Sequence, residues 1–150
     1  MKRTIYDEDH EAFRSSVRGF LDREVTPHWE KYIEAKEFPR ELWKAFGAQG
    51  LLGLEIPEQY GGSEAGDFRY NAVLGEELGR LSMSLGSCHG IHADIVAPYL
   101  VELTTDEQRE RWLPGFVSGD VLTAIAMTEP SGGSDLAARW AARSAARREE

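Results

Sequence analysis

Residues 120–135 read DVLTAIAMTEPSGGSD, and the main change of pattern along the chain falls in this stretch. Residues 120–127 are apolar and β-branched over a length suited to a strand. Residues 128–135 are rich in glycine and serine, which predicts a loop. A strand that enters a glycine-containing turn lets backbone N–H groups approach an anionic or polarised ligand, and the hydroxyls of Thr128 and Ser134 can donate hydrogen bonds. By composition alone, an ordinary strand-to-strand turn is the preferred interpretation.

Helical patterns precede this strand. Residues 7–35 place apolar side chains at spacings of three and four, which predicts an amphipathic helix that Pro27 breaks or bends near its end. A shorter helix is predicted to begin at Pro39, and its pattern weakens at Gly47. The same spacing predicts a helix over residues 67–81. Residues 51–68 mix a short apolar run with prolines and glycines and are predicted to form a turn and a loop.

Two further helices complete the pattern. Residues 83–103 are apolar on all sides, as expected for a helix deep in a bundle, and Pro98 should distort it. Thr105 and Gln108 have the spacing of a capping box, so a helix should begin there and end within residues 115–119.

The order of these elements predicts a mainly α fold, with four or five helices followed by the first strand of a β-domain. Residues 1–119 would form the helical domain, residues 120–136 would begin the β-domain, and residues 137–150 would form an Ala/Arg-rich polar helix or disordered tail. A strand needs a neighbour for its backbone hydrogen bonds, so we expect the chain to be a truncated part of a longer protein.

Composition excludes several classes of function. The 26 acidic and 17 basic residues give a net charge of −9, which would repel a nucleic acid backbone. No apolar run approaches the roughly 20 residues that a membrane-spanning helix needs. The single cysteine, Cys88, cannot form an internal disulfide. We therefore expect a soluble, cytoplasmic protein.

Two histidines and the cysteine lie close together in the sequence and are candidate reactive groups. His89 and His92 are three residues apart and could share a metal ion, but no third ligand lies nearby, so no metal site is predicted. Cys88 is adjacent to His89, yet neighbouring side chains on a helix point apart. We therefore expect Cys88 to be a buried small side chain, with a lining role in a ligand pocket as the alternative.

The run AMTEPSGGSD, residues 126–135, is similar to the signature of the acyl-CoA dehydrogenase family. That signature has a small or apolar residue, Ser or Thr, Glu, Pro, two small residues, Gly, Ser and Asp. FLDREVTP at residues 20–27, IPEQYGG at residues 56–62 and GEELG at residues 75–79 resemble the family in the same order. The resemblance covers residues 6–136 and implies a helical bundle of acyl-CoA dehydrogenase type followed by the family's middle β-domain. After Leu136 the chain departs from the pattern.

The resemblance implies that FAD binds in a cleft between the helical domain and the β-domain. Thr128 would hydrogen-bond the flavin ring near its reactive edge, and Ser134 would lie near the pyrophosphate and the pantetheine arm of the substrate. The residues expected to bind the cofactor are Ile125, Ala126, Met127, Thr128, Gly133 and Ser134.

The implied reaction is the α,β-desaturation of an acyl-CoA, as in fatty acid β-oxidation. A carboxylate removes the α-proton and FAD accepts the β-hydrogen as hydride. The resemblance also implies an electron-transfer flavoprotein as partner and a homo-oligomer. The family's base would follow the part that this chain matches, so no catalytic residue is assigned and the chain alone should be inactive. Two alternatives are a flavin oxidase or monooxygenase of the same fold and an inactive helical interaction protein.

Overall fold

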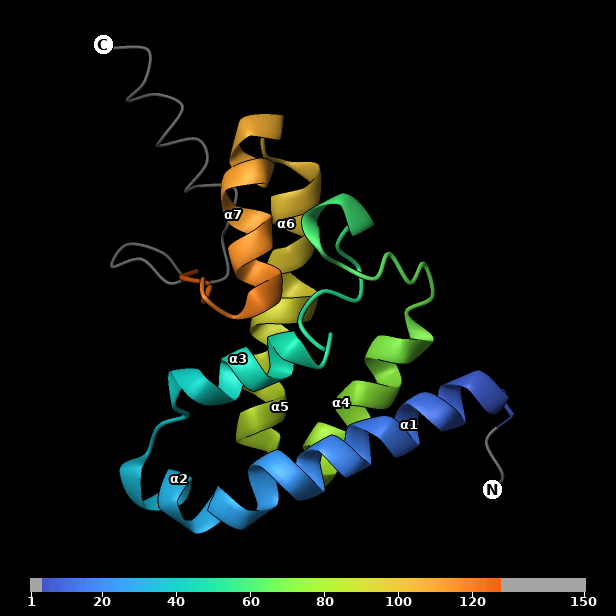
Figure 1. Ribbon diagram of the computed structural model, residues 1–150, viewed down its shortest axis with the longest axis vertical. Helices are drawn as coiled ribbons and strands as arrows, with labels where there is room; N and C mark the ends of the chain where they lie inside the picture. Colours follow the sequence, from blue (N-terminus) through green and yellow to red (C-terminus); the bar gives the residue numbers. More distant parts are fainter. Residues whose placement is uncertain (1–3, 128–150) are drawn as a thin grey trace.

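The computed structural model describes residues 4–127, and every regular element in this range is helical (Figure 1). The predicted turn at residues 128–135 and the tail at residues 137–150 lie outside the described residues. The elements are α1 (Glu8–Phe20), η1 (Leu21–Val25), η2 (Thr26–His28), α2 (Trp29–Ala35), α3 (Arg40–Ala48), η3 (Glu58–Tyr60), α4 (Arg69–Leu81), α5 (Met83–Gly90), η4 (Ile91–Val96), α6 (Ala97–Glu102) and α7 (Asp106–Ser118).

The predicted break near Pro27 is confirmed. α1 continues into a π-helical turn, η1, and then a 3₁₀ turn, η2, which contains the proline and leads into α2. The capping box at the start of α7 is confirmed as well. The Thr105 N–H donates to Gln108 Oε1 at 3.0 Å, and the Gln108 N–H donates to Thr105 Oγ1 at 3.3 Å.

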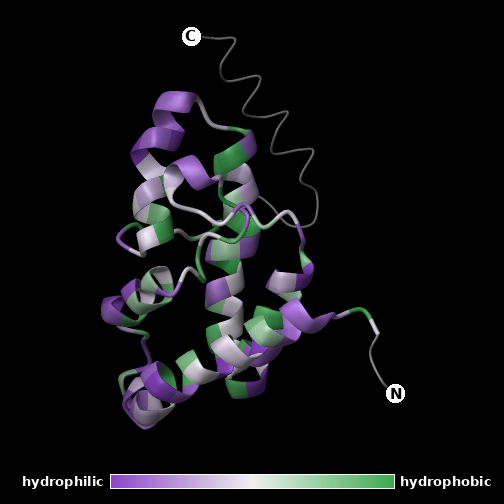
Figure 2. Ribbon diagram, turned by 45° about the vertical axis from the view of Figure 1, so that its right-hand side comes forward, coloured by the Kyte–Doolittle hydropathy of each residue, from purple (hydrophilic) through white to green (hydrophobic). Residues whose placement is uncertain are grey.

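Two apolar clusters form the core. The larger joins α1, η1, α3, α4 and α5, and Figure 2 shows hydrophobic and hydrophilic patches alternating along α1, as its amphipathic sequence requires. Its fully or nearly buried members include Val17, Phe20, Phe46, Leu52, Leu74, Leu78 and Leu85. The smaller cluster packs α7 against α6 and consists of Ile56, Ala97, Leu113, Phe116 and Val117. Burial of these faces is the main stabilising contribution.

The stretch predicted as one deep helix, residues 83–103, differs from that prediction. It consists of α5, the π-helix η4 and α6, with Pro98 in the first turn of α6. Met83, Ile95 and Tyr99 are exposed, as is Leu103 just after α6. The prediction that this stretch is buried on all sides was therefore wrong, because only one face of it meets the other helices.

The strand predicted over residues 120–127 is not formed within the described part of the chain. Residues 122–127 have no regular secondary structure, although their backbone leads away from the end of α7. A strand is defined by hydrogen bonds to a neighbouring strand, and residues 4–127 supply none. Among these same residues, none of the helices combines the length and apolar character that a membrane crossing needs.

Candidate functional site

The candidate site is built around residues 120–127, which we call the connecting segment because they lead from α7 toward the predicted flavin motif. α3 fixes its first residue, Asp120. Lys44 Nζ lies 3.0 Å from Asp120 Oδ1, and Arg40 donates a hydrogen bond to the Asp120 carbonyl at 2.8 Å. The hydrogen bond from Lys44, followed by that from Ser118, lowers the pKa of Asp120 below its ordinary value.

Two glycines allow the turn after α7 to touch α3. Gly119 has a φ of +78°, and a Cβ added to it would lie less than 3.0 Å from the carbonyl oxygen of Trp43. A Cβ on Gly47 would meet the carbonyl of Ser118 equally closely. Both backbones can approach only because these side chains are absent. The chain therefore leaves α7 in a fixed direction.

His92, on the π-helix η4, joins the end of α7 to the connecting segment. Its Nε2 lies 3.2 Å from the carbonyl oxygen of Phe116, so Nε2 carries the proton and donates. Its Nδ1 then accepts, and it lies 2.9 Å from Thr123 Oγ1 and 3.3 Å from the Thr123 nitrogen. The imidazole stacks on the Phe116 ring with centroids 3.8 Å apart. Burial lowers the pKa of His92 to about 4, so the ring is neutral at pH 7.

His89 performs a comparable task one turn earlier. Its Nε2 lies 2.9 Å from the carbonyl oxygen of Leu51, and burial lowers its pKa to about 4. Each of the two histidines thus bonds a backbone carbonyl inside the bundle. Within residues 4–127, no group of three potential metal ligands comes together.

A pocket of about 240 Å³ lies between η4, α3 and the connecting segment, and it is lined by Trp43, Cys88, Ile91, His92, Leu122, Thr123 and Ala124. A second, larger pocket of about 580 Å³ shares Trp43 and Cys88 with the first. These two side chains thus belong to the walls of both pockets, and the second extends toward Ile33 and Phe38 beside α2. We call the pair the apolar trough.

Cys88 lines both pockets of the apolar trough and is exposed. The expectation that it is a buried small side chain was therefore wrong. The reason is geometric: His89, its neighbour, takes the buried position on α5, and successive residues on a helix point in different directions.

Three of the predicted flavin-binding residues lie in the connecting segment, and the structure leaves all three accessible. Ile125 is 39% exposed, Met127 is 55% exposed, and Ala126 is exposed between them. Within residues 4–127 these three make no backbone hydrogen bond. Thr128, Gly133 and Ser134 lie outside the described residues.

The opposite end of the bundle, where α1 meets α4, is held by buried charges. The Glu77 side chain is 2% exposed and accepts hydrogen bonds from Arg14 at 2.8 Å and from Arg18 at 2.7 Å. Burial by itself raises the pKa of Glu77, but these two guanidinium groups outweigh it, and the pKa lies below its ordinary value. The carboxylate is therefore ionised at neutral pH.

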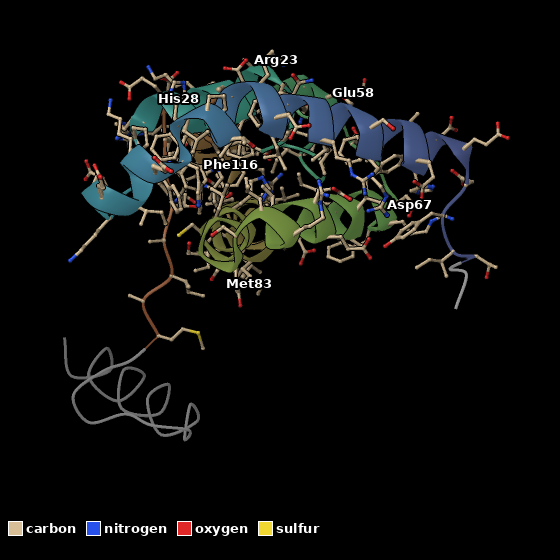
Figure 3. The ribbon with its side chains drawn as sticks, turned by 90° about the horizontal axis from the view of Figure 1, so that it is seen from below. Arg23, His28, Glu58, Asp67, Met83 and Phe116 are labelled. Carbon is tan, nitrogen blue, oxygen red and sulfur yellow. The ribbon has the colours of Figure 1, made fainter. Side chains whose placement is uncertain are left out.

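Beside this cluster, His10 lies buried between two acidic groups. Its Nδ1 is 2.5 Å from Asp7 at the start of α1, and its Nε2 is 3.4 Å from Asp67. Its ring stacks on Tyr70 with centroids 4.5 Å apart, and Arg69 hydrogen-bonds Asp67. Figure 3 shows Asp67 near the beginning of α1, so this cluster ties the entry to α4 to the N-terminal end of α1.

Comparison with known proteins agrees with this architecture. Residues 7–120 match the sequence profile of the acyl-CoA dehydrogenase N-terminal domain. The mitochondrial long-chain specific acyl-CoA dehydrogenase of Rattus norvegicus is 45% identical over 134 residues, which cover 89% of this chain and 31% of that protein. The crystal structure of an acyl-CoA dehydrogenase from Geobacillus kaustophilus has a TM-score of 0.84 and 43% identity, covering 91% of this chain and 35% of that one. An acyl-CoA dehydrogenase from Bacillus anthracis, crystallised with FAD, has a TM-score of 0.76 and 33% identity, covering 90% of this chain and 23% of that one.

The helical architecture and the matched residues together define the N-terminal domain of a known flavoenzyme class. The chain belongs to the acyl-CoA dehydrogenase family. It spans about a third of the length of the curated relatives it matches. Several of those relatives are named as mitochondrial proteins, so they lend no support to the cytoplasmic location expected from the sequence.

Proposed function

We propose that this chain supplies the helical domain and the first flavin-binding residues of an FAD-dependent acyl-CoA dehydrogenase. The observation that carries the proposal is the placement of the connecting segment. It is held by α3 and His92 at one end, and at the other it presents Ile125, Ala126 and Met127, which are exposed and form no hydrogen bond within residues 4–127, beside the apolar trough.

The residues present fit a flavin. The exposed side chains of Ile125 and Met127 offer apolar surface for the ring system, and the backbone between them, which forms no hydrogen bond within the described residues, offers donors and acceptors for its polar edge. In this proposal Thr128, Gly133 and Ser134 continue the same site, with Ser134 also meeting the substrate. When bound, FAD accepts the β-hydrogen of the acyl group as hydride.

The trough fits the acyl tail of a thioester. Its apolar lining near the connecting segment includes Trp43, Ile91 and Leu122. Cys88 lines both of its pockets. An acyl chain placed there would be removed from water, and each methylene buried contributes about 0.8 kcal/mol. The role of this chain is thus to hold the acyl group and to align it beside the flavin.

In this proposal the chain does not itself supply the group that removes the α-proton. The α-proton would pass to a carboxylate outside this chain, and we expect no desaturation by the chain alone. An acyl-CoA as substrate, an electron-transfer flavoprotein as electron acceptor and assembly as a homo-oligomer belong to the same proposal. The comparisons do not favour a flavin oxidase or monooxygenase, nor an inactive helical interaction protein.

Alkylation of Cys88 tests the proposal, because the chain has no other cysteine. Iodoacetamide should modify the exposed thiol readily, and mass spectrometry follows the reaction at one site. Octanoyl-CoA or palmitoyl-CoA should slow alkylation by covering the trough, whereas free CoA, which lacks the acyl tail, should not. In parallel, FAD binding is measured by quenching of flavin fluorescence.

Each arm of this experiment has a defined negative outcome. Equal protection by free CoA and acyl-CoA would remove the trough as the acyl site. Failure of FAD to bind at high micromolar chain concentration would contradict the flavin assignment for this chain. Reduction of bound FAD by an acyl-CoA would contradict the expectation that the chain is inactive by itself.

A further inference from the structure

We propose that His92 is a positioning residue: it fixes the path along which the connecting segment carries Ile125, Ala126 and Met127 to the flavin. The flavin part of this inference rests on the function proposed above. The positioning part rests on the geometry of the chain and can be tested without any cofactor.

The hydrogen bonds of the connecting segment become sparse along its length. Asp120 is held by α3, and the Val121 N–H donates to the Gly115 carbonyl at 2.9 Å. Thr123 is held through both its N–H and its hydroxyl, and His92 is the partner in each case. Within the described range, no later residue of the segment forms a hydrogen bond. Among residues 4–127, Thr123 is thus the last residue of the segment that a hydrogen bond holds, two residues before Ile125.

Few side chains could replace His92 in this place. The group must donate to the Phe116 carbonyl on one side and accept from Thr123 on the other, and a neutral imidazole does both across one rigid ring. The ring also packs between Phe116 and Trp43, with its centroid 3.8 Å and 5.9 Å from theirs. Its orientation is therefore set by α7 and α3, and it transmits that orientation to the segment.

Amide hydrogen exchange in the chain tests this role. His92→Phe keeps a flat ring against Phe116 but removes both hydrogen bonds. The Thr123 amide loses its acceptor, and we expect its exchange to accelerate by about fivefold or more, as loss of one hydrogen bond of ordinary net strength predicts. Thr123→Val removes only the hydroxyl contact and should increase exchange less, whereas Thr123→Ser keeps the hydroxyl and should restore protection.

His89→Phe is the matched control, since His89 is buried on the same stretch of helix and bonds Leu51 instead of the segment. It should loosen the bundle without a selective change at Thr123. An unchanged exchange rate of the residue 123 amide in both His92→Phe and Thr123→Val would overturn the proposal. An equally large increase in the exchange rates of amides in α1 and α4 would overturn it as well, because that pattern reports general destabilisation.

The same variants are then titrated with FAD. We expect weaker FAD binding in His92→Phe and Thr123→Val and normal binding in Thr123→Ser. FAD binding unchanged by His92→Phe, despite faster exchange at Thr123, would overturn the link between His92 and the flavin site. If the unmodified chain binds no FAD, the proposed function fails for this chain, while the exchange data still decide whether His92 positions the segment.

Discussion

The two ends of the bundle are stabilised in opposite ways. Where α1 meets α4, the buried Glu77 and Arg14 neutralise each other, and the exposed Arg18 adds a further ion pair to Glu77. Along α5 and η4, the buried histidines are neutral, and His89 and His92 bond the backbone carbonyls of Leu51 and Phe116. The charged groups of the first end pair with one another, whereas the second end has the apolar trough and, beside it, the exposed connecting segment.

This difference indicates which end is organised for a ligand. The guanidinium groups of Arg14 and Arg18 compensate the buried Glu77 carboxylate, so charges within the bundle hold the α1–α4 end together. Neutral hydrogen-bonding groups place a backbone without bringing a net charge into the site, which suits an apolar acyl chain and a flavin ring. We therefore expect stability to depend on the first end and ligand alignment on the second.

The largest effect is expected at Glu77. Glu77→Ala removes the closest partner of the buried Arg14, whose remaining acidic neighbours are Glu76 at 2.9 Å and Glu11 at 3.3 Å. Breaking a buried ion pair typically costs about 3–5 kcal/mol, and because Arg14 keeps these two partners we expect a loss at the lower end of that range, about 3 kcal/mol. Urea unfolding followed by circular dichroism measures the change. Arg80→Ala is the control, because Arg80 is 65% exposed and lies 3.4 Å from the same carboxylate. It should cost less than about 1 kcal/mol. Equal losses in the two variants would show that the cluster contributes only as surface charge.

The second effect is a loss of stability in mild acid that depends on His92. Because its pKa falls from 6.5 to about 4 on folding, the unfolded chain binds more protons between these values. The contribution of His92 is complete above pH 6.5 and decreases as the pH falls toward 4, by up to roughly 3 kcal/mol. Unfolding free energies at pH 7, 6, 5 and 4.5 should decline less steeply in His92→Phe than in the unmodified chain.

Other titratable groups change the free energy of unfolding over different pH ranges or in the opposite direction. The pKa values of Glu77 and Asp67 are held below their ordinary values, so these carboxylates lose their contribution at lower pH. Burial raises the pKa of Asp94, which therefore opposes the histidines slightly. His89 has the same shift as His92 and remains in both proteins. An identical pH dependence in the two proteins would contradict the neutral, buried state of His92.

A smaller effect is expected at the turn after α7. Gly119→Ala places a Cβ on a residue with positive φ and against the carbonyl of Trp43, so we expect a loss of about 2 kcal/mol. Gly50 has a similar φ of +75° but open space around it, and Gly50→Ala should cost only about 1 kcal/mol. Thermal unfolding compares the two. A smaller loss at Gly119 than at Gly50 would mean that the contact with α3 does not constrain the turn.

The smallest effect on stability is expected at Met127. Its side chain is exposed, so Met127→Ser should change the free energy of unfolding by less than about 0.5 kcal/mol. FAD binding, in contrast, should weaken, because apolar contact surface is lost. Val17→Ser provides the reverse control, since Val17 is fully buried in the larger core cluster and should affect stability strongly. A destabilised Met127→Ser chain would indicate that this residue belongs to the bundle core.

The sequence predicts local structure well where the signal is local. The spacing of apolar residues located α1, α3 and α4, Pro27 marked the break before α2, and the Thr105–Gln108 pair marked the start of α7. Each of these depends on residues within a few positions of one another. The predicted strand at residues 120–127 depends on a distant neighbour, and it does not form within the described residues.

The site was predictable only in part, for the same reason. A family motif points to Ile125, Ala126 and Met127, and all three are exposed. The sequence gives no sign that Phe116 and Thr123 lie within hydrogen-bonding distance of His92, so its spacing from His89 suggests only a metal ligand. For the trough, the sequence indicates only Cys88 as an alternative pocket residue, because the other walls come from α2, α3 and the connecting segment, which are far apart in the chain.

The π-helix η4 has a consequence for the geometry of everything that follows it. A π turn closes its hydrogen bond over one more residue than an α turn, so η4 holds length that an α-helix would not need. Deleting one residue within Ile91–Val96 would leave the length of an α turn, so η4 could relax to α geometry while α6 keeps nearly the same angular phase relative to α5. A deletion inside α5 or α6 would instead rotate every later side chain of this stretch by about 100°, the step of one residue in an α-helix. The π-helix is thus the place in this stretch where the chain can lose one residue without turning Ile95 and Tyr99 away from their present side of the bundle.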